Sequence, residues 1–138
     1  ERRGMSNLQE RILQTDASIL PFEDNFFQYA VSRGVLDSMT FNLASKAVKE
    51  LGRVLKQGGL FYCDLISGDD SSHAREFSGE EIRTTTHEEG TVQLYFNIEL
   101  IRSLLEQFFE IVECNLIRFE DVIRGMYHSR YHLVLRRL

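Results

Sequence analysis

The feature that most constrains the fold is a helix pattern that leads directly into an apolar strand pattern. Over residues 42–56, apolar side chains recur at three- and four-residue spacing, and charged side chains take the opposite face. Gly58-Gly59 is expected to end this helix. Residues 60–66 then form an almost unbroken apolar run, which is typical of a strand covered on both faces. A helix followed by such a strand predicts an α/β protein built on a layered sheet.

Two further strands are predicted before this helix, over residues 11–15 and 26–32. Both runs are short and contain aromatic or β-branched residues, which favours strands over helices. The polar segment 67–81 is rich in serine, glycine and acidic residues, so it is predicted to be a surface connection.

The C-terminal half predicts a hairpin, a second helix and an antiparallel strand pair. Residues 82–96 hold two β-rich runs around a glycine-containing loop, and Asn97 is predicted to cap a helix with one apolar face. Strands at 109–119 and 129–136 follow each other without a helix, so they are expected to pair antiparallel, with His128 in the loop between them. The predicted fold class is therefore an α/β doubly wound sheet with a mixed edge.

Composition narrows the classes of partner. The chain has 138 residues, 43% of them hydrophobic, and a net charge of -5, which fits one packed domain and argues against a basic nucleic-acid surface. No apolar run reaches the ~20 residues of a membrane span and no signal-peptide pattern is present, so we expect no membrane partner and a cytoplasmic location. Cys63 and Cys114 lie in apolar runs and are predicted to be reduced thiols, with no spacing that suits a metal.

Several segments become specific when their order and spacing are taken together. They are residues 15–27 (TDASILPFEDNFF), 30–39 (AVSRGVLDSM) and 51–59 (LGRVLKQGG), with further likeness at 96–100 and 108–111. In this arrangement they resemble the class I S-adenosylmethionine-dependent methyltransferases, although Gln57 stands where proline is usual.

The resemblance implies a Rossmann-like methyltransferase sheet, of which residues 1–138 form the C-terminal portion of a single domain. This portion would hold strands 3 to 7 of the usual seven and the terminal antiparallel pair. The first two strands, the glycine-rich cofactor loop and the acidic residue for the ribose would precede Glu1, and Glu1-Arg2-Arg3-Gly4 is typical of the frayed end of a helix. We therefore expect a longer native protein. A second chain that completes the sheet by swapping, or a refolded fragment, are the alternatives, and the open sheet favours self-association.

Candidate cofactor residues follow two predicted strands. Asp16 can accept a hydrogen bond from an adenine amino group, and Ala17 and Ile19 can line the slot for the ring, since ligands of open α/β sheets bind beyond the carboxyl ends of the strands. In the family the stretch Ser32-Arg33-Gly34 lies along the methionine part of the cofactor, S-adenosyl-L-methionine. Asp16 as a plain turn former and Arg33 as a solvated charge are the structural alternatives.

Catalytic residues are less defined, since methyl transfer depends mainly on positioning the two reactants. Asp37 is the candidate that could orient or deprotonate an acceptor, or it could cap the following helix. Tyr127, His128, Arg130 and His132 form a second polar group that could touch an anionic substrate or only decorate a sheet edge. A hairpin at residues 80–96 falls where the family often builds its acceptor lid, so it is expected near the acceptor site.

The function expected from the resemblance is methyl transfer from S-adenosylmethionine to a small-molecule acceptor. A methyltransferase-like partner subunit that stabilises another protein is the alternative, and a nucleotide-dependent oxidoreductase is disfavoured by residues 16–22. Because the glycine-rich loop is expected upstream, we expect the 138-residue chain by itself to bind the cofactor weakly or not at all.

Overall fold

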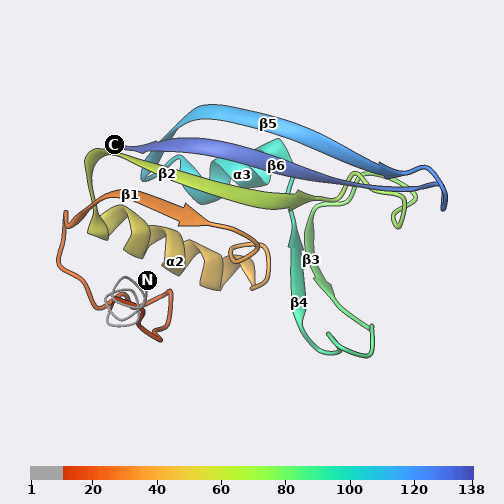
Figure 1. Cartoon of the computed structure of the whole chain (residues 1–138), viewed down its shortest axis with the longest axis horizontal. Coiled ribbons are helices and arrows are strands. Elements are labelled where there is room, and N and C mark those ends of the chain that lie inside the picture. The colour runs from red at the N-terminus through yellow and green to blue at the C-terminus, as the bar shows by residue number, and fades with distance from the viewer. Residues whose placement is uncertain (1–10) are drawn as a thin grey trace, which may run out of the picture.

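The computed structural model describes residues 11–138 as a mixed four-stranded sheet, two helices and a separate hairpin (Figure 1). The sheet order is β1-β2-β6-β5, in which β1 and β2 are parallel and the other two pairs are antiparallel. Its strands are β1 (Phe27–Ser32), β2 (Leu55–Ser67), β5 (Phe109–Asp121) and β6 (Met126–Arg137). The α/β class and the terminal antiparallel pair are thereby confirmed.

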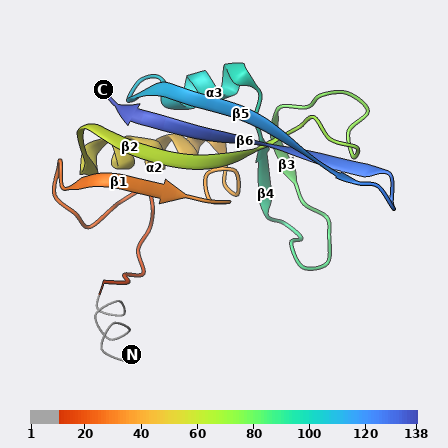
Figure 2. The same cartoon turned by 45° about the horizontal axis from the view of Figure 1, so that its top comes forward.

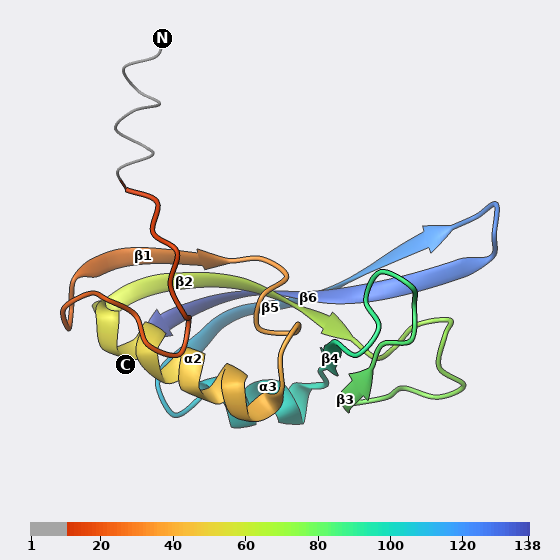
Figure 3. The same cartoon turned by 90° about the horizontal axis from the view of Figure 1, so that it is seen from below.

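Both helices lie on the same face of the sheet, so the prediction that residues 60–66 form a strand covered on both faces is wrong within residues 11–138. They are α2 (Phe41–Val54) and α3 (Ile98–Leu105), and Figures 2 and 3 show them on one side of the four strands. Alternate residues of β2 and β6, among them Phe61, Leu65 and Leu133, are fully buried in the core toward this side. Neither helix is long and apolar enough to cross a membrane within the part of the chain that the structure describes.

Helix α2 begins at its predicted place because Thr40 caps it. The Thr40 side chain accepts a hydrogen bond from the Leu43 backbone N–H, which satisfies one of the free donors of the first turn. The apolar stripe buries Ala44, Ala47 and Val48 against the sheet. The predicted helix over 42–56 is confirmed within two residues.

The prediction that Gly58-Gly59 ends this helix is wrong. The helix ends at Val54, and β2 begins at the next residue, so the glycines lie inside the strand. A side chain at Gly59 would meet the Gln28 carbonyl oxygen at 2.9 Å. The glycine therefore serves the close approach of β2 to β1, where the pairing register shifts between Phe27 and Tyr29.

The predicted strand over residues 11–15 is also wrong. Residues 12–16 have no regular structure, and the side chains of Ile12 and Leu13 are 73% and 55% exposed. A strand needs a neighbour for its backbone hydrogen bonds, and no strand within residues 11–138 pairs with this segment. Self-association through the open sheet stays a prediction.

The predicted hairpin and second helix are both present, but the first hairpin strand already ends at Ile82, the first residue of the range predicted for the hairpin strands. Strands β3 (Gly79–Ile82) and β4 (Val92–Tyr95) pair antiparallel, so the first strand begins earlier than the sequence indicated. Asn97 then caps α3 by accepting a hydrogen bond from the Leu100 N–H at 2.8 Å. The polar segment before the hairpin is less exposed than predicted, because Ser67 and Asp70 are buried.

The β5–β6 ladder is longer than the sequence indicated. It continues to the pair Asp121↔Met126, so the turn between the strands is short. His128 therefore lies in β6 and is paired with Phe119, and its predicted loop position is wrong. Cys63 and Cys114 are both free thiols, as predicted, and burial raises the pKa of each above its ordinary value.

Candidate functional site

The segment after β1 and the turn at residues 16–19 meet at the carboxyl end of β1. Ala17, Ser32 and Arg33 line a small cavity of about 220 Å³ together with apolar side chains of α2. Three of the six predicted cofactor residues are thus brought together. Ile19 is 73% exposed and does not line this cavity.

Asp16 closes the turn beside this cavity. Its Oδ1 accepts hydrogen bonds from the Ser18 N–H at 2.8 Å and the Ser18 hydroxyl at 2.7 Å. These two hydrogen bonds hold the pKa of the Asp16 carboxyl below its usual value. The other oxygen, Oδ2, has no hydrogen-bond partner among the described residues, so Asp16 forms the turn and still offers an acceptor.

Gly34, the last predicted cofactor residue, is held by a buried carboxylate. Its φ of 64° is a left-handed conformation that favours glycine, and its N–H donates to Asp64 Oδ1 at 2.7 Å. Burial alone would raise the pKa of Asp64. The Gly34 hydrogen bond and the charge of Arg130 outweigh that effect and hold this pKa below its usual value.

Asp37 is the most connected residue of this edge, and its side chain is only 2% exposed. Its Oδ2 accepts hydrogen bonds from the Ile66 N–H and from Arg130 Nη2, each at 2.8 Å. Its backbone carbonyl accepts from the Leu94 N–H and the Gln93 side-chain amide, at 2.8 and 2.6 Å. The expectation that Asp37 caps a helix is wrong, because Thr40 caps α2. Its catalytic role stays a prediction.

Arg130 completes this network from β6. Its guanidinium also reaches Asp64, with Nε 3.2 Å from Oδ2, so one arginine bridges two buried carboxylates. The Tyr62 hydroxyl oxygen lies 2.5 Å from Nδ1 of His132, which is two residues further along β6. Tyr62 and Asp64 belong to β2, and Arg130 and His132 belong to the neighbouring strand β6.

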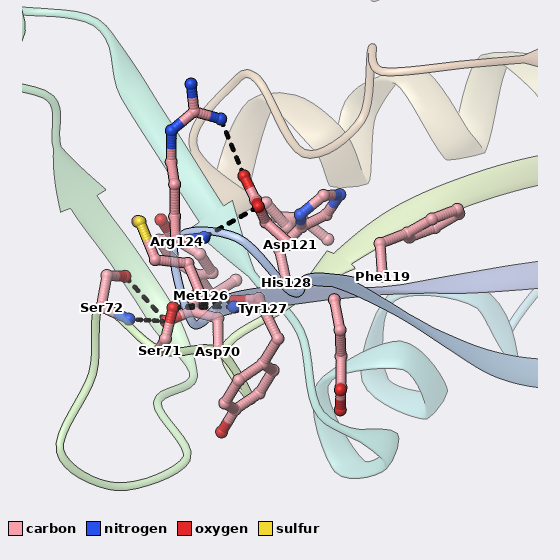
Figure 4. Close-up of a pocket in the computed structure, with 12 residues that line it drawn as sticks. Asp70, Ser71, Ser72, Phe119, Asp121, Arg124, Met126, Tyr127 and His128 are labelled. Carbon is pink, nitrogen blue, oxygen red and sulfur yellow. Dashed lines mark hydrogen bonds and ion pairs between the residues drawn. The ribbon is translucent and has the colours of Figure 1, made fainter.

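Tyr127 and His128 belong to a different place. They line a larger cavity of about 580 Å³ between the loop that follows β2 and the far end of the β5–β6 hairpin (Figure 4). The remaining lining residues are Ile66, Asp70, Ser71, Ser72, Tyr95, Phe119, Glu120, Asp121, Arg124 and Met126. The four residues predicted as one polar group are therefore separated: Tyr127 and His128 line this pocket, Arg130 belongs to the ion-pair network, and His132 contacts Tyr62.

One wall of the pocket is fixed by a histidine held between two carboxylates. His73 Nδ1 lies 2.8 Å from Asp70 Oδ1, and Nε2 lies 2.9 Å from Glu81 Oε2 on β3. The imidazole stacks on Phe77 and meets the edge of Tyr95. The hydrogen bonds to Glu81 and Asp70 raise the pKa of His73 despite its burial.

This bridge is not predicted from the sequence, because Asp70 and His73 lie in the polar segment 67–81, which has the composition of a surface connection. The available signal was the spacing Asp70-Ser71-Ser72-His73, in which an aspartate can accept hydrogen bonds from the next residues and from a histidine three positions on. Glu81 has no local signal, because the hairpin brings it to His73.

The N-terminal part of the chain is similar in sequence to known methyltransferases. A family model described as "Methyltransferase domain" matches residues 2–63. The demethylmenaquinone methyltransferase of Staphylococcus carnosus is 40% identical over 62 residues, which are 44% of this chain and 24% of that protein. The chain thus matches about a quarter of this relative's length.

Solved structures extend the likeness to nearly the whole chain. A SAM-dependent methyltransferase from Methanosarcina mazei has a TM-score of 0.70 at 24% identity, covering 90% of this chain and 65% of that one. The 1,6-didemethyltoxoflavin-N1-methyltransferase of Burkholderia thailandensis, with bound 1,6-didemethyltoxoflavin and S-adenosylhomocysteine, has a TM-score of 0.68 at 15% identity, covering 96% of this chain and 56% of that one.

The sheet, the helices on its face and the edge beyond β1 define an α/β domain of the methyltransferase type. More specifically, the chain has the fold of the class I S-adenosylmethionine-dependent methyltransferases, and its residues 2–63 match the methyltransferase domain family. The resemblance drawn from residues 15–59 is confirmed.

Proposed function

We propose that this chain is part of an enzyme that transfers a methyl group from S-adenosyl-L-methionine to a small-molecule acceptor. The observation that carries the proposal is the cavity at the end of β1, where Ala17, Ser32 and Arg33 meet within the segment that matches the methyltransferase family. The fold places this cavity at the carboxyl end of a parallel strand, where open α/β sheets bind ligands.

The residues present fit the adenosine side of the cofactor. Asp16 offers Oδ2 as an acceptor for an amino group, and Ala17 adds an apolar surface beside it. Gly34 gives the backbone room, because nothing lies within 4 Å of the position of a side chain there. When bound, the cofactor supplies an electrophilic methyl group on a sulfonium sulfur. The chain's own residues bind it, orient it and exclude water.

The loop between Gly34 and Asp37 positions this edge. Asp64 holds the first residue through its backbone N–H, and Arg130 and Ile66 hold the side chain of the last. A rigid edge of this kind favours methyl transfer because the rate depends on keeping donor and acceptor aligned. Since the Asp37 carboxylate is buried and paired with arginine, we assign it the role of a positioning residue.

The acceptor is proposed to bind on the side of the β3–β4 hairpin. The Asp37 carbonyl joins this hairpin to the loop after β1 through the Leu94 N–H at 2.8 Å, which brings hairpin and cofactor edge into one unit. The net charge of -5 favours a small molecule over a nucleic acid. The names of two similar proteins, a demethylmenaquinone methyltransferase and a toxoflavin-precursor methyltransferase, support a small-molecule acceptor.

Calorimetric titration of the native protein with S-adenosylhomocysteine tests the proposal. Asp16→Ala is expected to weaken binding about tenfold, because a hydrogen bond to a charged group is lost. Glu23→Ala, an exposed acidic residue of the same loop, is the control and should bind like the wild type. No binding by the native protein would overturn the proposal and favour a non-catalytic methyltransferase-like subunit. Unchanged binding by Asp16→Ala would overturn the assignment of Asp16.

A further inference from the structure

We infer that the pocket between the loop after β2 and the tip of the β5–β6 hairpin binds an acceptor that carries a protonated amine beside a flat apolar part, with Asp70 as the group that recognises the amine. This pocket is the 580 Å³ cavity of Figure 4. The inference rests on the proposed function in taking the occupant of this pocket to be the methyl acceptor.

One carboxylate oxygen of Asp70 accepts several hydrogen bonds, and the other accepts none among the described residues. Its side chain is 7% exposed, and Oδ1 accepts hydrogen bonds from the Ser72 N–H and hydroxyl, at 2.9 and 2.7 Å, and from the His73 N–H at 3.1 Å, besides the contact with His73 Nδ1. No described hydrogen bond reaches Oδ2. Within residues 11–138, the buried side-chain polar atoms that lack a hydrogen-bond partner are Ser129 Oγ and His132 Nε2. Asp70 Oδ2 is not one of them, so it is accessible to solvent, and Asp70 lines the pocket.

The carboxylate is held in its charged form. Burial alone would raise the pKa of Asp70, but the hydrogen bonds from Ser72 and His73 hold it below its usual value. His73 itself is shared with Glu81, so even a protonated imidazole is matched by two carboxylates. This wall of the pocket therefore keeps a negative charge that a bound cation can neutralise.

The other lining carboxylates are each paired with an arginine, which leaves Asp70 as the group that a cation can neutralise. The acidic lining residues are Asp70, Glu120 and Asp121, and Arg124 is the lining arginine. That guanidinium is already bound to Asp121 at 2.7 Å. Glu120 lies 3.7 Å from Arg118, whose guanidinium also lies over the Tyr127 ring. Asp70 is therefore the lining carboxylate with no arginine partner among the described residues, and its charge attracts a cation and repels a carboxylate or a phosphate.

Aromatic side chains supply a surface for the flat part of the ligand. Phe119 stacks on His128 with ring centroids 5.2 Å apart and an angle of 17° between the planes, and Tyr95 and Tyr127 also line the cavity. Figure 4 shows Asp70 and Ser72 at one side of the group and Phe119 at the other. Aromatic faces favour flat apolar groups and cations, so the two ends of the pocket suit the two parts of one ligand.

The residues that line the pocket lie outside the segment that matches the family model. The family match ends at residue 63, and every lining residue follows it, beginning with Ile66. The match to the methyltransferase domain therefore says nothing about this pocket, and its lining residues alone define the ligand.

Three probes of similar shape test the charge preference. They are 2-phenylethylamine, 2-phenylethanol and 3-phenylpropionate, titrated into ¹⁵N-labelled protein and followed by amide chemical shifts. We expect the amine to bind about tenfold more tightly than the alcohol, since it adds a charged hydrogen bond, with shifts at Asp70, Phe119 and Tyr127. Equal affinity for amine and alcohol, tighter binding of the carboxylate, or shifts confined to another part of the chain would overturn the inference.

Two variants and a control complete the experiment. Asp70→Asn keeps an acceptor for Ser72 and His73 and removes the charge, so it should abolish the preference for the amine over the alcohol. Phe119→Leu, at a side chain that is 47% exposed, should fold normally and weaken amine and alcohol alike. Glu113→Gln, on an exposed position of β5 outside the pocket, should bind all probes as the wild type does.

A folded Asp70→Asn that still prefers the amine, or a Phe119→Leu that binds both probes unchanged, would contradict the inference. These titrations need neither cofactor nor methyl transfer. A protein that binds the amine at this pocket and fails to bind S-adenosylhomocysteine would therefore refute the proposed function and leave the pocket assignment standing.

Discussion

Replacement of Arg130 by methionine removes the cation that joins two buried carboxylates. In the wild type, Nη2 lies 2.8 Å from Asp37 Oδ2 and Nε lies 3.2 Å from Asp64 Oδ2. The side chains of the arginine and the two aspartates are 23%, 2% and 7% exposed, so solvent screens these pairs only weakly. Methionine fills a similar volume and leaves both carboxylates without a counter-ion.

The expected loss of unfolding free energy depends on the hydrogen bonds that each carboxylate retains in the variant. Removal of one partner of a buried ion pair typically destabilises a protein by about 3–5 kcal/mol. Asp37 keeps its hydrogen bond from the Ile66 N–H, and Asp64 keeps that from the Gly34 N–H, so neither is left bare. We therefore expect a loss near the lower end, about 3 kcal/mol, which is a large share of the ~5–15 kcal/mol that stabilises a typical domain.

Urea unfolding at pH 7 and at successively lower pH measures this loss. The pKa of Asp64 is lowered in the folded wild type, so its ion pair contributes full stability above the unfolded value of 3.8 and loses it as the pH falls through the folded pKa. The variant has no such pair to lose. The difference in unfolding free energy should therefore be largest at pH 7 and should shrink as Asp64 becomes protonated.

Arg102→Met is the matched control. Arg102 pairs with Glu106 at 3.6 Å on the surface of α3, where the two side chains are 64% and 55% exposed. Such a pair contributes only about 0.3–0.5 kcal/mol. The reasoning is refuted if Arg130→Met costs no more than this control at pH 7, or if its cost does not decrease in acid.

Three further changes test other parts of the fold. Asn97→Ala should cost about 1 kcal/mol in urea unfolding, because α3 loses the acceptor for the Leu100 N–H, and an unchanged midpoint would contradict the cap. Gly68→Ala should lower the free energy of unfolding by about 2 kcal/mol or more, and lower the melting temperature, because the new methyl group would lie 1.7 Å from the Phe77 carbonyl oxygen. A variant with unchanged stability would contradict this close approach of the two backbone segments. His73→Gln should lower stability more at pH 6 than at pH 9, because a raised histidine pKa contributes stability below the unfolded value of 6.5 that is lost as the pH rises through the folded pKa; a loss independent of pH would exclude a charged bridge.

Local patterns were sufficient to predict the elements that depend on local interactions. The apolar stripe of residues 42–56, the hairpin around residue 90 and the cap at Asn97 each depend on residues a few positions apart, and each is present in the structure. The strand predicted at residues 11–15 fails for the complementary reason. A short apolar run becomes a strand only when another strand lies beside it, and composition does not reveal that neighbour.

The candidate site divides in the same way. Ala17, Ser32 and Arg33 could be placed at one edge because strand ends meet there, and the structure brings them together. The partners of Asp37 could not be foreseen, because they come from three different strands. The buried position of Asp70 was hidden in a polar segment whose composition is typical of an exposed loop.

The hydrogen bonds of Asp37 have a consequence for the order in which the chain can fold. They join it to residues that are 29, 56 and 93 positions further along the sequence. Contacts of such separation form late, because long loops must close first. We therefore expect the loop after β1 to stay unfinished on the ribosome until β6, the strand that carries Arg130, has left the exit tunnel.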